Sequence, residues 1–555
     1  WTRALSLVVG SSTYAFSMML VAFLVGLAAG SALFARWWGD RALPAWSFAL
    51  LQLGIGATAA VVLPYFDRLP DLFLVAFRVT RDSRVIILAQ FLVSGLAMLL
   101  PTLLMGATFP CAVRLLARGA GSVGMDVGRV YAVNTLGAIL GTIAAGFVLI
   151  PAWGLQHSLT AASLLNLLGA AALGLASLRE SRRAFPLAVA GLAAAGVALL
   201  PAIPTWDRNV MASGVVVYGP QYAAGGQGGR LRDLAPADVE LLFYRDGLGA
   251  TVSVHRRGDE RSLRVNGKTD ASTGQDMHTQ LMLGHLPLLL HPAPRKVLVI
   301  GLGSGVTAAA VAQYPVETVD VVEIEPAVVE AATFFARENR EVLRNPRVRV
   351  HIADGRNFLL TRTAPLDVII SEPSNPWMSG IGNLYALDFY AMAARRLQPD
   401  GLFVQWIHAY QLDIEDLRMV VATFRQVFPH VSLWSGTTGD FLLVGSRRPV
   451  SVDPSRLRRR TDSSPGIRQD LDRLGMSDPL AILADFVLAE PDLARFSEGG
   501  LLNTDDLPLL EFSAPLSMYR DTSALTMRVL DRFRTSRFPP LYPGTDPVVL
   551  NDPAF

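Results

Sequence analysis

The first 203 residues are dominated by apolar runs that are each long enough to cross the roughly 30 Å hydrocarbon core of a membrane as a helix. Glycine and alanine recur within these runs, which suits close packing between membrane helices. A set of buried soluble helices is the alternative, but so many long uncharged runs disfavour it. The pattern predicts a multi-pass α-helical membrane domain of about six spans. The spans are expected at residues 12–34, 45–65, 85–106, 130–150, 158–178 and 185–203.

The composition agrees with a chain that is partly embedded in lipid. Hydrophobic residues make up 51% of it and charged residues only 17%, whereas a soluble domain has roughly 25% charged residues. The formal net charge of +2 gives no electrostatic case for a nucleic-acid partner. The single cysteine, Cys111, excludes an internal disulfide framework and a cysteine-based zinc cluster. We expect a buried thiol there and no metal site.

The residue pattern changes after Pro204, where the long apolar runs end. Glycine and polar residues predict a linker over 204–239, and short alternating strands then predict a small β-meander over 240–267. From 268 to 450, strands alternate with helical patterns, which is typical of a Rossmann-like, doubly wound and mostly parallel sheet. Residues 451–555 are expected to form an Arg-rich linker and a helical extension. The strands of the α/β region are predicted at 297–300, 318–323, 347–352, 366–370 and 402–405.

Polar residues follow four successive strands of this predicted sheet. The strand KVLVI runs into a glycine turn, and Glu323 ends the next strand about twenty residues later. A glycine turn lets a ligand approach the backbone, and an acid at that distance can accept hydrogen bonds from both ribose hydroxyls. The GxGxG spacing favours an S-adenosylmethionine-type nucleoside over NAD. The predicted nucleoside-binding residues are Gly301, Gly303, Ser304, Gly305, Glu323, Asp354 and Gly355, and the fourth strand leads into Glu372.

The stretch from Val265 to about Leu402 resembles the aminopropyltransferases, that is, the spermidine and spermine synthases. It contains VNGKTDASTGQDMHTQ, KVLVIGLGSG, VVEIEP, HIADGRNFL, VIISEPSNP and LYALDFY in the order and spacing of that family. The β-meander resembles the family's N-terminal β domain. The preceding spans resemble the membrane-fused bacterial branch of the family.

This resemblance implies transfer of a 3-aminopropyl group from decarboxylated S-adenosylmethionine to an amine, with release of methylthioadenosine. Glu323 would bind the ribose hydroxyls, and Asp354 with Gly355 would hold the adenine edge. Glu372 falls at the position of the family's catalytic aspartate. No permanently bound cofactor is implied. Further contacts with the substrate are expected from Gln280, Asn375, Ser379 and Tyr385.

Three departures from the family pattern concern the handling of the amine. Ser304 stands where the family has an aspartate that grips the aminopropyl ammonium, and Asn375 stands where it has a second acid. Gln280 replaces a histidine that frames the amine site. Because a serine would not repel a carboxylate, intact S-adenosylmethionine is an alternative donor. The segment 503–512 is rich in acids and could lend carboxylates to this site, with a solvated turn as its alternative.

Three readings of the function remain open from the sequence. The first is a membrane-bound aminopropyltransferase-like enzyme that acts on a small-molecule amine. The second is an S-adenosylmethionine-dependent methyltransferase that releases S-adenosylhomocysteine, and the third is a non-catalytic nucleoside or polyamine sensor or transporter. The expected partners are the lipid bilayer and a second copy of the chain, as a homodimer.

The expected location is the inner membrane of the cell. Two arguments disagree about the side of the membrane on which the catalytic domain lies. Arginine-rich loops at 36–41, 114–129 and 179–183 favour one alternation of the spans, which places the C-terminal half outside the cell. S-adenosyl donors are made in the cytoplasm, and for that reason we expect the catalytic domain to be cytoplasmic.

Overall fold

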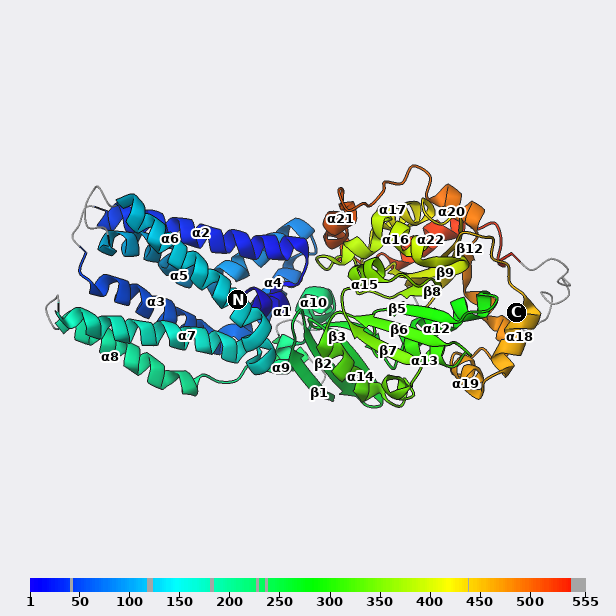
Figure 1. Ribbon diagram of the computed structural model, residues 1–555, viewed down its shortest axis with the longest axis horizontal. Coiled ribbons are helices and arrows are strands. Elements are labelled where there is room, and N and C mark those ends of the chain that lie inside the picture. The colour runs from blue at the N-terminus through cyan, green and yellow to red at the C-terminus, as the bar shows by residue number, and fades with distance from the viewer. Residues whose placement is uncertain are drawn as a thin grey trace. The chain divides into compact units, whose positions relative to one another are not determined.

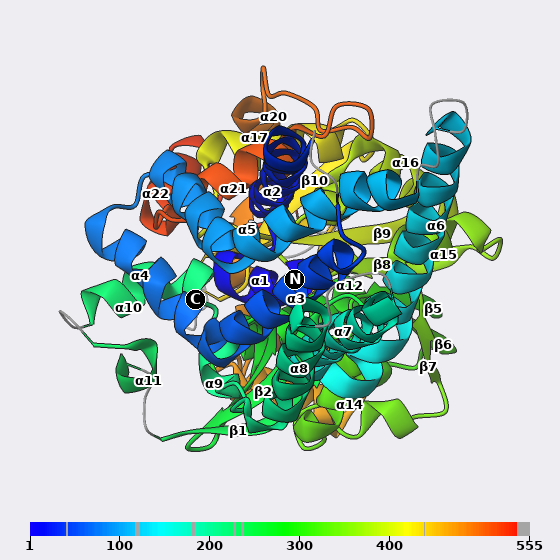
Figure 2. The ribbon, with the colours of Figure 1, turned by 90° about the vertical axis from the view of Figure 1, so that its left-hand side faces the viewer.

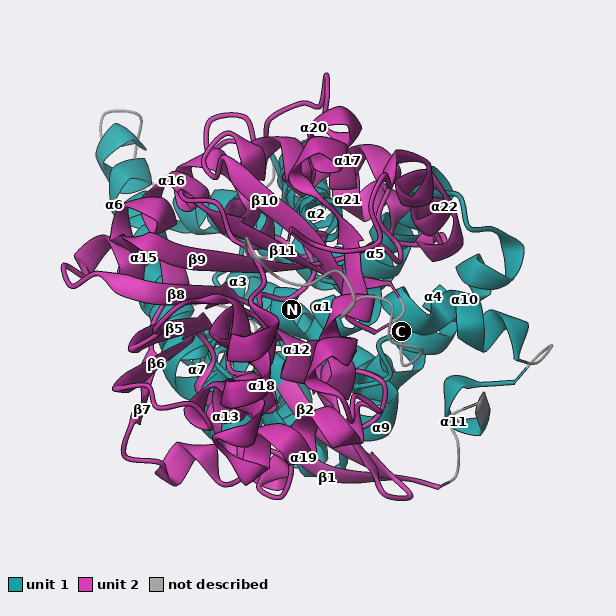
Figure 3. Ribbon diagram, turned by 90° about the vertical axis from the view of Figure 1, so that its right-hand side faces the viewer, with its two compact units in different colours: residues 1–237, 244–251 teal, residues 238–243, 252–555 magenta. Residues whose placement is uncertain are grey.

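The computed structural model describes residues 1–39, 43–116, 123–179, 184–225, 229–234, 238–437 and 439–540. Much of the three arginine-rich loops lies outside these residues. The chain divides into two compact units (Figure 3). A helical unit contains residues 1–237 and 244–251, and an α/β unit contains residues 238–243 and 252–555.

Long apolar helices build the helical unit. Helix α2 runs beside α5, and α3 packs against both α7 and α8 (Figures 1 and 2). The helices are α1 Thr2–Val9, α2 Thr13–Trp38, α3 Trp46–Val62, α4 Leu69–Val79, α5 Ser83–Leu116, α6 Val123–Ile143, α7 Ile150–Ala176, α8 Ala184–Leu199, α9 Arg208–Met211, α10 Val215–Ala224 and α11 Leu231–Leu234.

Glycines set the distance between α2 and α5. A methyl group added at Gly26 would lie 1.9 Å from the Thr102 hydroxyl oxygen, and one at Gly30 would lie 1.8 Å from the Leu103 carbonyl oxygen. On the facing helix, a methyl group at Gly106 would lie 2.2 Å from the Leu27 carbonyl oxygen. The two backbones can therefore approach this closely only because these positions carry no side chain, as is common between membrane helices.

Five helical runs in the described residues are long and apolar enough to cross a membrane, where the sequence predicts about six. The difference arises because the fourth and fifth predicted spans lie in one run of 54 residues, Val123–Ala176. That run breaks at Gly154, whose φ of 81° and ψ of 173° are not helical. The Asp246 carboxylate accepts the backbone N–H of Leu155 just after the break (2.8 Å), which satisfies one of the free donors at the start of the new helix.

The predicted linker 204–239 contains packed structure, which corrects the expectation. Helices α9, α10 and α11 fall within it, and α10 packs against α4. The side chains of Val215, Val216 and Val217 are buried, and Gly219 lies directly against the Phe77 ring. The glycine-rich character that suggested a linker is confined to the later part of this stretch, and the apolar VVVY run before it forms the helix.

Two sheets and eleven α-helices of seven or more residues are described from residue 238 onward, and the end of β1 and the first residue of β2 are counted in the helical unit. The strands are β1 Val239–Asp246, β2 Thr251–Arg257, β3 Glu260–Val265, β4 Lys268–Ser272, β5 Lys296–Ile300, β6 Thr318–Glu323, β7 Val348–Ile352, β8 Leu366–Ser371, β9 Leu397–His408, β10 His430–Ser435, β11 Asp440–Ser446 and β12 Phe486–Leu488. The helices are α12 Met277–Leu290, α13 Val306–Ala312, α14 Pro326–Ala332, α15 Gly355–Thr361, α16 Leu387–Arg396, α17 Ile414–Arg425, α18 Pro454–Asp462, α19 Pro465–Arg473, α20 Glu490–Phe496, α21 Leu509–Ser517 and α22 Ser523–Phe533.

The larger sheet is mixed, with the strand order β12-β10-β11-β9-β8-β5-β6-β7. Strands β5 to β9 pair in parallel, and they are the five strands that the sequence predicts. Strands β10, β11 and β12 extend the sheet with antiparallel pairing and were not predicted. The smaller sheet has the order β1-β2-β3-β4, and its last strand, β4, lies beyond the predicted meander of residues 240–267.

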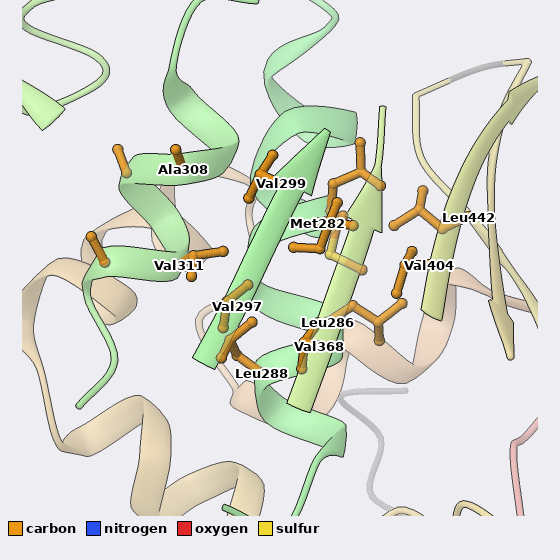
Figure 4. Packing of buried hydrophobic residues seen from close by; sticks show 14 of the residues in the cluster. Met282, Leu286, Leu288, Val297, Val299, Ala308, Val311, Val368, Val404 and Leu442 are labelled. Carbon is orange, nitrogen blue, oxygen red and sulfur yellow. The ribbon is translucent and has the colours of Figure 1, made fainter. Parts of the chain in front are cut away.

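The core of the α/β unit lies between the larger sheet and its covering helices. Met282 and Leu286 of α12 pack on the sheet beside Val297, Val368 and Val404, which come from three adjacent parallel strands (Figure 4). Helix α12 is buried nearly all round, since every residue from Thr279 to Leu290 is buried. This packing holds the segment before β5 firmly against the sheet.

The Arg-rich stretch after 450 is not a linker, which corrects a second expectation. It forms α18, in which Leu457 is buried. Arg460 donates to the carbonyl oxygens of Leu288, His291 and Pro292, and so satisfies carbonyl groups at the end of α12. Farther along, β12 joins the larger sheet through β10. The C-terminal segment is therefore part of the same unit as the strands before it.

Candidate active site

The candidate site lies where the order of the parallel strands reverses. The chain runs from β5 outward through β6 and β7, and then returns to place β8 and β9 on the other side of β5. The backbone N–H of Glu372 donates to Ile300 O (2.9 Å), and that of Gly301 donates to Val322 O (2.9 Å). These hydrogen bonds link the carboxyl ends of β5, β6 and β8. Ligands of open α/β sheets bind at such a point, outside the carboxyl ends of the strands.

The turn after β5 depends on its glycines. Gly301, Gly303 and Gly305 have φ values of 95°, 51° and 83°, in the left-handed region that other residues avoid. A methyl group at Gly301 would also lie 2.4 Å from the carbonyl oxygen of Glu372. The sequence prediction of a tight glycine turn is therefore explained by backbone conformation and by the closeness of the Glu372 segment.

Glu323 ends β6 with its carboxylate turned to the glycine turn. Its Oε2 accepts the backbone N–H of Leu302 (3.0 Å), and its Oε1 accepts that of Glu325 (2.9 Å). The side chain is buried, and burial raises the pKa of Glu323 above its ordinary value against the effect of these two hydrogen bonds. The backbone holds the carboxylate beside the turn, where a ribose could contact its remaining lone pairs.

Asp354 and Gly355 follow β7 and begin α15. The Asp354 Oδ1 accepts the backbone N–H of Asn357 (2.8 Å), so this side chain caps the helix. Gly355 lies against Ile300, and a methyl group there would be 2.7 Å from the Ile300 Cγ2. At the carboxyl end of β7, next to Glu323, Asp354 thus caps α15 and Gly355 allows close packing against Ile300. The structure places them at the edge of the sheet where the adenine role was expected.

Glu372 directly follows β8, the neighbour of β5 on the side opposite to β6. It is half-buried, and the Thr307 hydroxyl donates to its Oε2 (2.7 Å). Burial raises the pKa of Glu372 to about 8, Thr307 opposes the shift, and the carboxylates of Asp440, Asp276 and Asp270 add to it. A carboxyl group with such a pKa can hold or release a proton near neutral pH, which is what a general base requires.

The raised pKa of Glu372 predicts a pH dependence of stability. Because the folded pKa of about 8 exceeds the ordinary 4.5, the folded state keeps a proton that the unfolded state releases between these values. The contribution is fully present below about pH 4.5 and is lost as the pH rises through 8. The stability of the wild type relative to Glu372→Gln should therefore fall as the pH rises from about 4.5 to 8 and then level off. Thermal unfolding of both proteins across that range measures it, and parallel curves would refute the shift.

Three further carboxylates raise the pKa of Glu372. The sequence left Asp276 open between contact with the substrate and a core or capping role, and it did not point to Asp270 or Asp440. With Glu372 they form what we call the acid cluster: Asp270, Asp276, Glu372 and Asp440. Asp440 begins β11, and its Oδ2 accepts a hydrogen bond from the Thr279 hydroxyl (2.7 Å). Burial raises the pKa of Asp440 to about 7. Asp270 lies in β4, where its Oδ1 accepts from the Ser374 hydroxyl (2.7 Å). The cluster supplies further carboxyl groups to a site where Asn375 replaces the second acid of the family pattern.

Ser304 and Gln280, two of the departures from the family pattern, contact each other. The Ser304 hydroxyl donates to the Gln280 side-chain oxygen, and the Gln280 amide nitrogen donates to the Ser272 carbonyl (2.9 Å). Both side chains are buried, with exposures of 1% and 3%. Through these hydrogen bonds the two side chains link the glycine turn to Ser272, and both side chains are uncharged.

The other residues that were predicted to contact the substrate lie in three different environments. Asn375 is fully buried close to the Tyr410 hydroxyl, on the segment that follows Glu372. Tyr385 is also fully buried, but its hydroxyl donates to the Trp406 carbonyl (3.1 Å), so it lies in the packed interior. Ser379 is exposed on the loop between them. The structure brings Asn375 to the acid cluster and gives Tyr385 a packing role.

The acid-rich segment near residue 505 contacts the loop that follows Glu372. Glu511 accepts the backbone N–H of Gly380 (2.9 Å), and the Asn503 amide donates to the Gly382 carbonyl (3.0 Å). Asp505 forms a two-pronged ion pair with Arg356 of α15. Residues 505–507 form an exposed bend, as the solvated-turn alternative expects, and the rest of the segment contacts the neighbouring loop.

A cavity of about 440 Å³ lies at the other end of the sheet. It is lined by residues near the amino ends of β5 and β6, among them Lys296 and Thr318, and by Asp320, which is already paired with His351 and Arg362. Its walls lack the glycine turn and the acid cluster. We place the chemistry at the carboxyl ends of the strands, because perturbed carboxyl groups gather there.

Comparisons with known proteins agree with the sequence resemblance. Residues 277–440 match the spermine/spermidine synthase domain family. The polyamine aminopropyltransferase of Mycobacterium tuberculosis (strain ATCC 25618 / H37Rv) is 29% identical over 416 residues, which cover 71% of this chain and 71% of the relative. That share exceeds the whole α/β unit, so the match extends into the helical unit. The polyamine aminopropyltransferase of Caldicellulosiruptor saccharolyticus is 30% identical over 187 residues, covering 32% of this chain and 67% of the relative.

A spermidine synthase solved in complex with the transition state analogue AdoDATO has 23% sequence identity and a TM-score of 0.38, over 42% of this chain and 88% of that chain. The spermidine synthase of Dictyostelium discoideum is 30% identical over 170 residues, which cover 30% of this chain and 60% of the relative. On the evidence of the domain match and these sequence relatives, the chain belongs to the spermidine synthase-like family and is a transferase of the polyamine aminopropyltransferase type.

Proposed function

We propose that this chain transfers the aminopropyl group of decarboxylated S-adenosylmethionine to an amine, at the carboxyl ends of β5, β6, β7 and β8. The amine nitrogen attacks the methylene carbon attached to the sulfonium, a C–N bond forms and the C–S bond breaks. The sulfur leaves as the neutral thioether methylthioadenosine. The proton released by the new secondary ammonium passes to a carboxylate. This role falls to Glu372, and Glu323 and Asp354 hold the nucleoside.

The observation that carries the proposal is the placement of Glu372. Its backbone carbonyl lies against Gly301 of the glycine turn, and its carboxyl group accepts a hydrogen bond from Thr307, which follows that turn. Its pKa of about 8 suits acceptance of a proton, and the acid cluster attracts a cationic amine. The sulfonium is already a good leaving group, so the protein needs to align two reactants and remove one proton. The residues at the site supply these two functions.

Product analysis tests the proposal. The purified full chain is incubated with an amine mixture and either decarboxylated or intact S-adenosylmethionine, and the nucleoside products are identified by mass spectrometry. Methylthioadenosine formed from the decarboxylated donor is the expected result. S-adenosylhomocysteine would instead identify a methyltransferase, and binding without turnover would identify a sensor or transporter.

We also propose that the helical unit spans the cell's inner membrane, with the α/β unit on the cytoplasmic side. The five apolar runs have window hydropathies of 1.7 to 2.2, and large side chains such as Leu136, Ile139 and Phe147 are exposed on them. Exposed apolar surface of this extent is stable in lipid and costly in water. Membrane fractionation and a protease-accessibility assay in sealed vesicles decide both points, and a soluble chain or a site outside the cytoplasm would overturn them.

A further inference from the structure

One lysine lies inside the acid cluster. Lys268 begins β4 and is 8% exposed. Its Nζ donates to the Asp270 Oδ1 (2.9 Å) and lies 5.8 Å from the centre of the Trp406 ring. Burying an ammonium is costly unless a carboxylate or an aromatic face replaces its water, and Lys268 has both. Its ammonium is therefore held between Asp270 of the acid cluster and the Trp406 ring.

The choice of lysine at this position is unusual for the chain. Lys268 is one of two lysines, and the other 47 of the 49 basic residues are arginines. A lysine ammonium is a compact point charge, whereas an arginine guanidinium is a broad planar fork. Position 268 thus carries the same chemical group as the ammonium of an amine substrate.

Lys268 belongs to the same electrostatic cluster as Glu372. The Asp270 carboxylate that accepts from Lys268 also accepts from Ser374, two residues after Glu372. On the other side, Lys268 lowers the pKa of Asp440, and the Asp440 carboxylate raises the pKa of Glu372. The ammonium of Lys268 is therefore coupled to the same acids that would attract an amine substrate.

This lysine changes the charge that the cluster can offer to a substrate. A diamine brings two ammonium groups and needs carboxylates for each. Lys268 already engages Asp270 directly and acts on Asp440 through space. Glu372 and Asp276 remain for the substrate, and Glu372 is needed at the reacting nitrogen. A second substrate ammonium would meet the positive charge of Lys268 in a partly desolvated site, where like charges repel strongly.

Uncharged polar groups lie next to this cluster. His408 is fully buried, and neither of its ring nitrogens has a hydrogen-bond partner among the described residues. Burial and the charge of Lys268 keep the pKa of His408 well below its ordinary value, so the ring is neutral and offers one donor and one acceptor. Trp377 and Tyr410 flank the ring, at centroid distances of 4.5 and 4.7 Å.

Asn375 adds an amide to the same place. It is fully buried, has the Tyr410 hydroxyl as a polar neighbour, and makes no hydrogen bond of ordinary geometry within the described ranges. Buried polar groups without partners are rare in folded proteins and each calls for an explanation. An uncharged polar group of a substrate would satisfy both His408 and Asn375.

From this arrangement we infer that Lys268 determines the class of acceptor: an amine with a single ammonium group and a distal uncharged hydrogen-bonding group, such as an amino alcohol. Lys268 occupies the place of a second substrate ammonium, and His408 with Asn375 receives the uncharged end. The inference rests on the proposed aminopropyl transfer and specifies its acceptor.

The test uses two acceptors that differ at one end, 1,4-diaminobutane and 4-aminobutan-1-ol. With decarboxylated S-adenosylmethionine and the full chain, kcat/KM for methylthioadenosine formation is measured for each. The wild type should prefer the amino alcohol by about tenfold or more, the effect of one charge-assisted contact. Lys268→Met, which keeps a chain of similar length without the charge, should shift the ratio toward the diamine by about tenfold.

The matched control is Lys296→Met, at the amino end of β5, which should leave the ratio unchanged. Competition between the two acceptors in the wild type decides the preference even where Lys268→Met does not fold. A wild type that prefers the diamine, or a ratio that Lys268→Met leaves unaltered, overturns the inference alone. Failure to form methylthioadenosine with either acceptor overturns the proposed function as well.

Discussion

Replacing Glu372 with glutamine lowers kcat by about 10²- to 10⁴-fold, the usual contribution of a general base. The amide keeps the size of the side chain and can still bond to the Thr307 hydroxyl, but it cannot accept the proton of the amine. The affinity for methylthioadenosine should change by less than about threefold, because Glu372 acts on the amine and not on the nucleoside. Steady-state kinetics with saturating donor, together with calorimetric titration of methylthioadenosine, separate the two effects.

The control for Glu372→Gln is Glu317→Gln. Glu317 forms an exposed ion pair with Arg295 at the amino end of β6, remote from the acid cluster, and exposed pairs contribute little to stability. Its replacement should leave kcat unaltered. A value of kcat for Glu372→Gln within about threefold of the wild type would show that another group accepts the proton.

Replacing Glu323 with glutamine produces the opposite pattern, a loss of donor binding with kcat largely retained. Two charge-assisted hydrogen bonds to the ribose hydroxyls are weakened, and at about 1.5–3 kcal/mol for such bonds the dissociation constant of methylthioadenosine should rise about 100-fold. The donor KM should rise in parallel. Calorimetry of methylthioadenosine binding and kinetics at raised donor concentration measure both quantities.

Glu325→Gln is the matched control for this second substitution. Glu325 is also buried and lies two residues farther along, but its carboxylate caps α14 through the backbone N–H of Ala327. It should lose some stability as a weakened cap and keep its affinity for the nucleoside within a few-fold. Equal losses of affinity in the two variants would assign the effect to the local backbone, and the ribose contact would then be wrong.

The five parallel strands of the larger sheet could be predicted because their evidence is local. Each is a short apolar run followed by a polar residue, and their order in the chain places Gly301, Glu323, Asp354 and Glu372 on one edge. Strands β10 to β12 escaped prediction because antiparallel pairing at the edge of a mixed sheet depends on tertiary contacts. The same applies to α18, where a charge run suggested a linker although Leu457 anchors it.

The acid cluster could not be predicted from local patterns. Asp270 and Asp440 come from strands of two different sheets, and the fold alone brings them to Glu372. Asn375 is indeed an amide where the family has an acid, but carboxylates from other parts of the chain lie near Glu372. Ser304 and Gln280 were also beyond local patterns. The sequence predicts that each contacts the ligand, whereas in the structure their side chains are hydrogen-bonded to each other. An acid at the turn of a β-hairpin, as at Gly439-Asp440 between β10 and β11, is a signal that sequence analysis could have weighed.

A structure determined with methylthioadenosine bound to the full chain tests the central claim most directly. The account predicts ribose hydroxyls on the Glu323 carboxylate, the adenine beside Asp354, and the sulfur facing Glu372 across the glycine turn. A nucleoside bound elsewhere, or a sulfur turned away from Glu372 and the acid cluster, would contradict it.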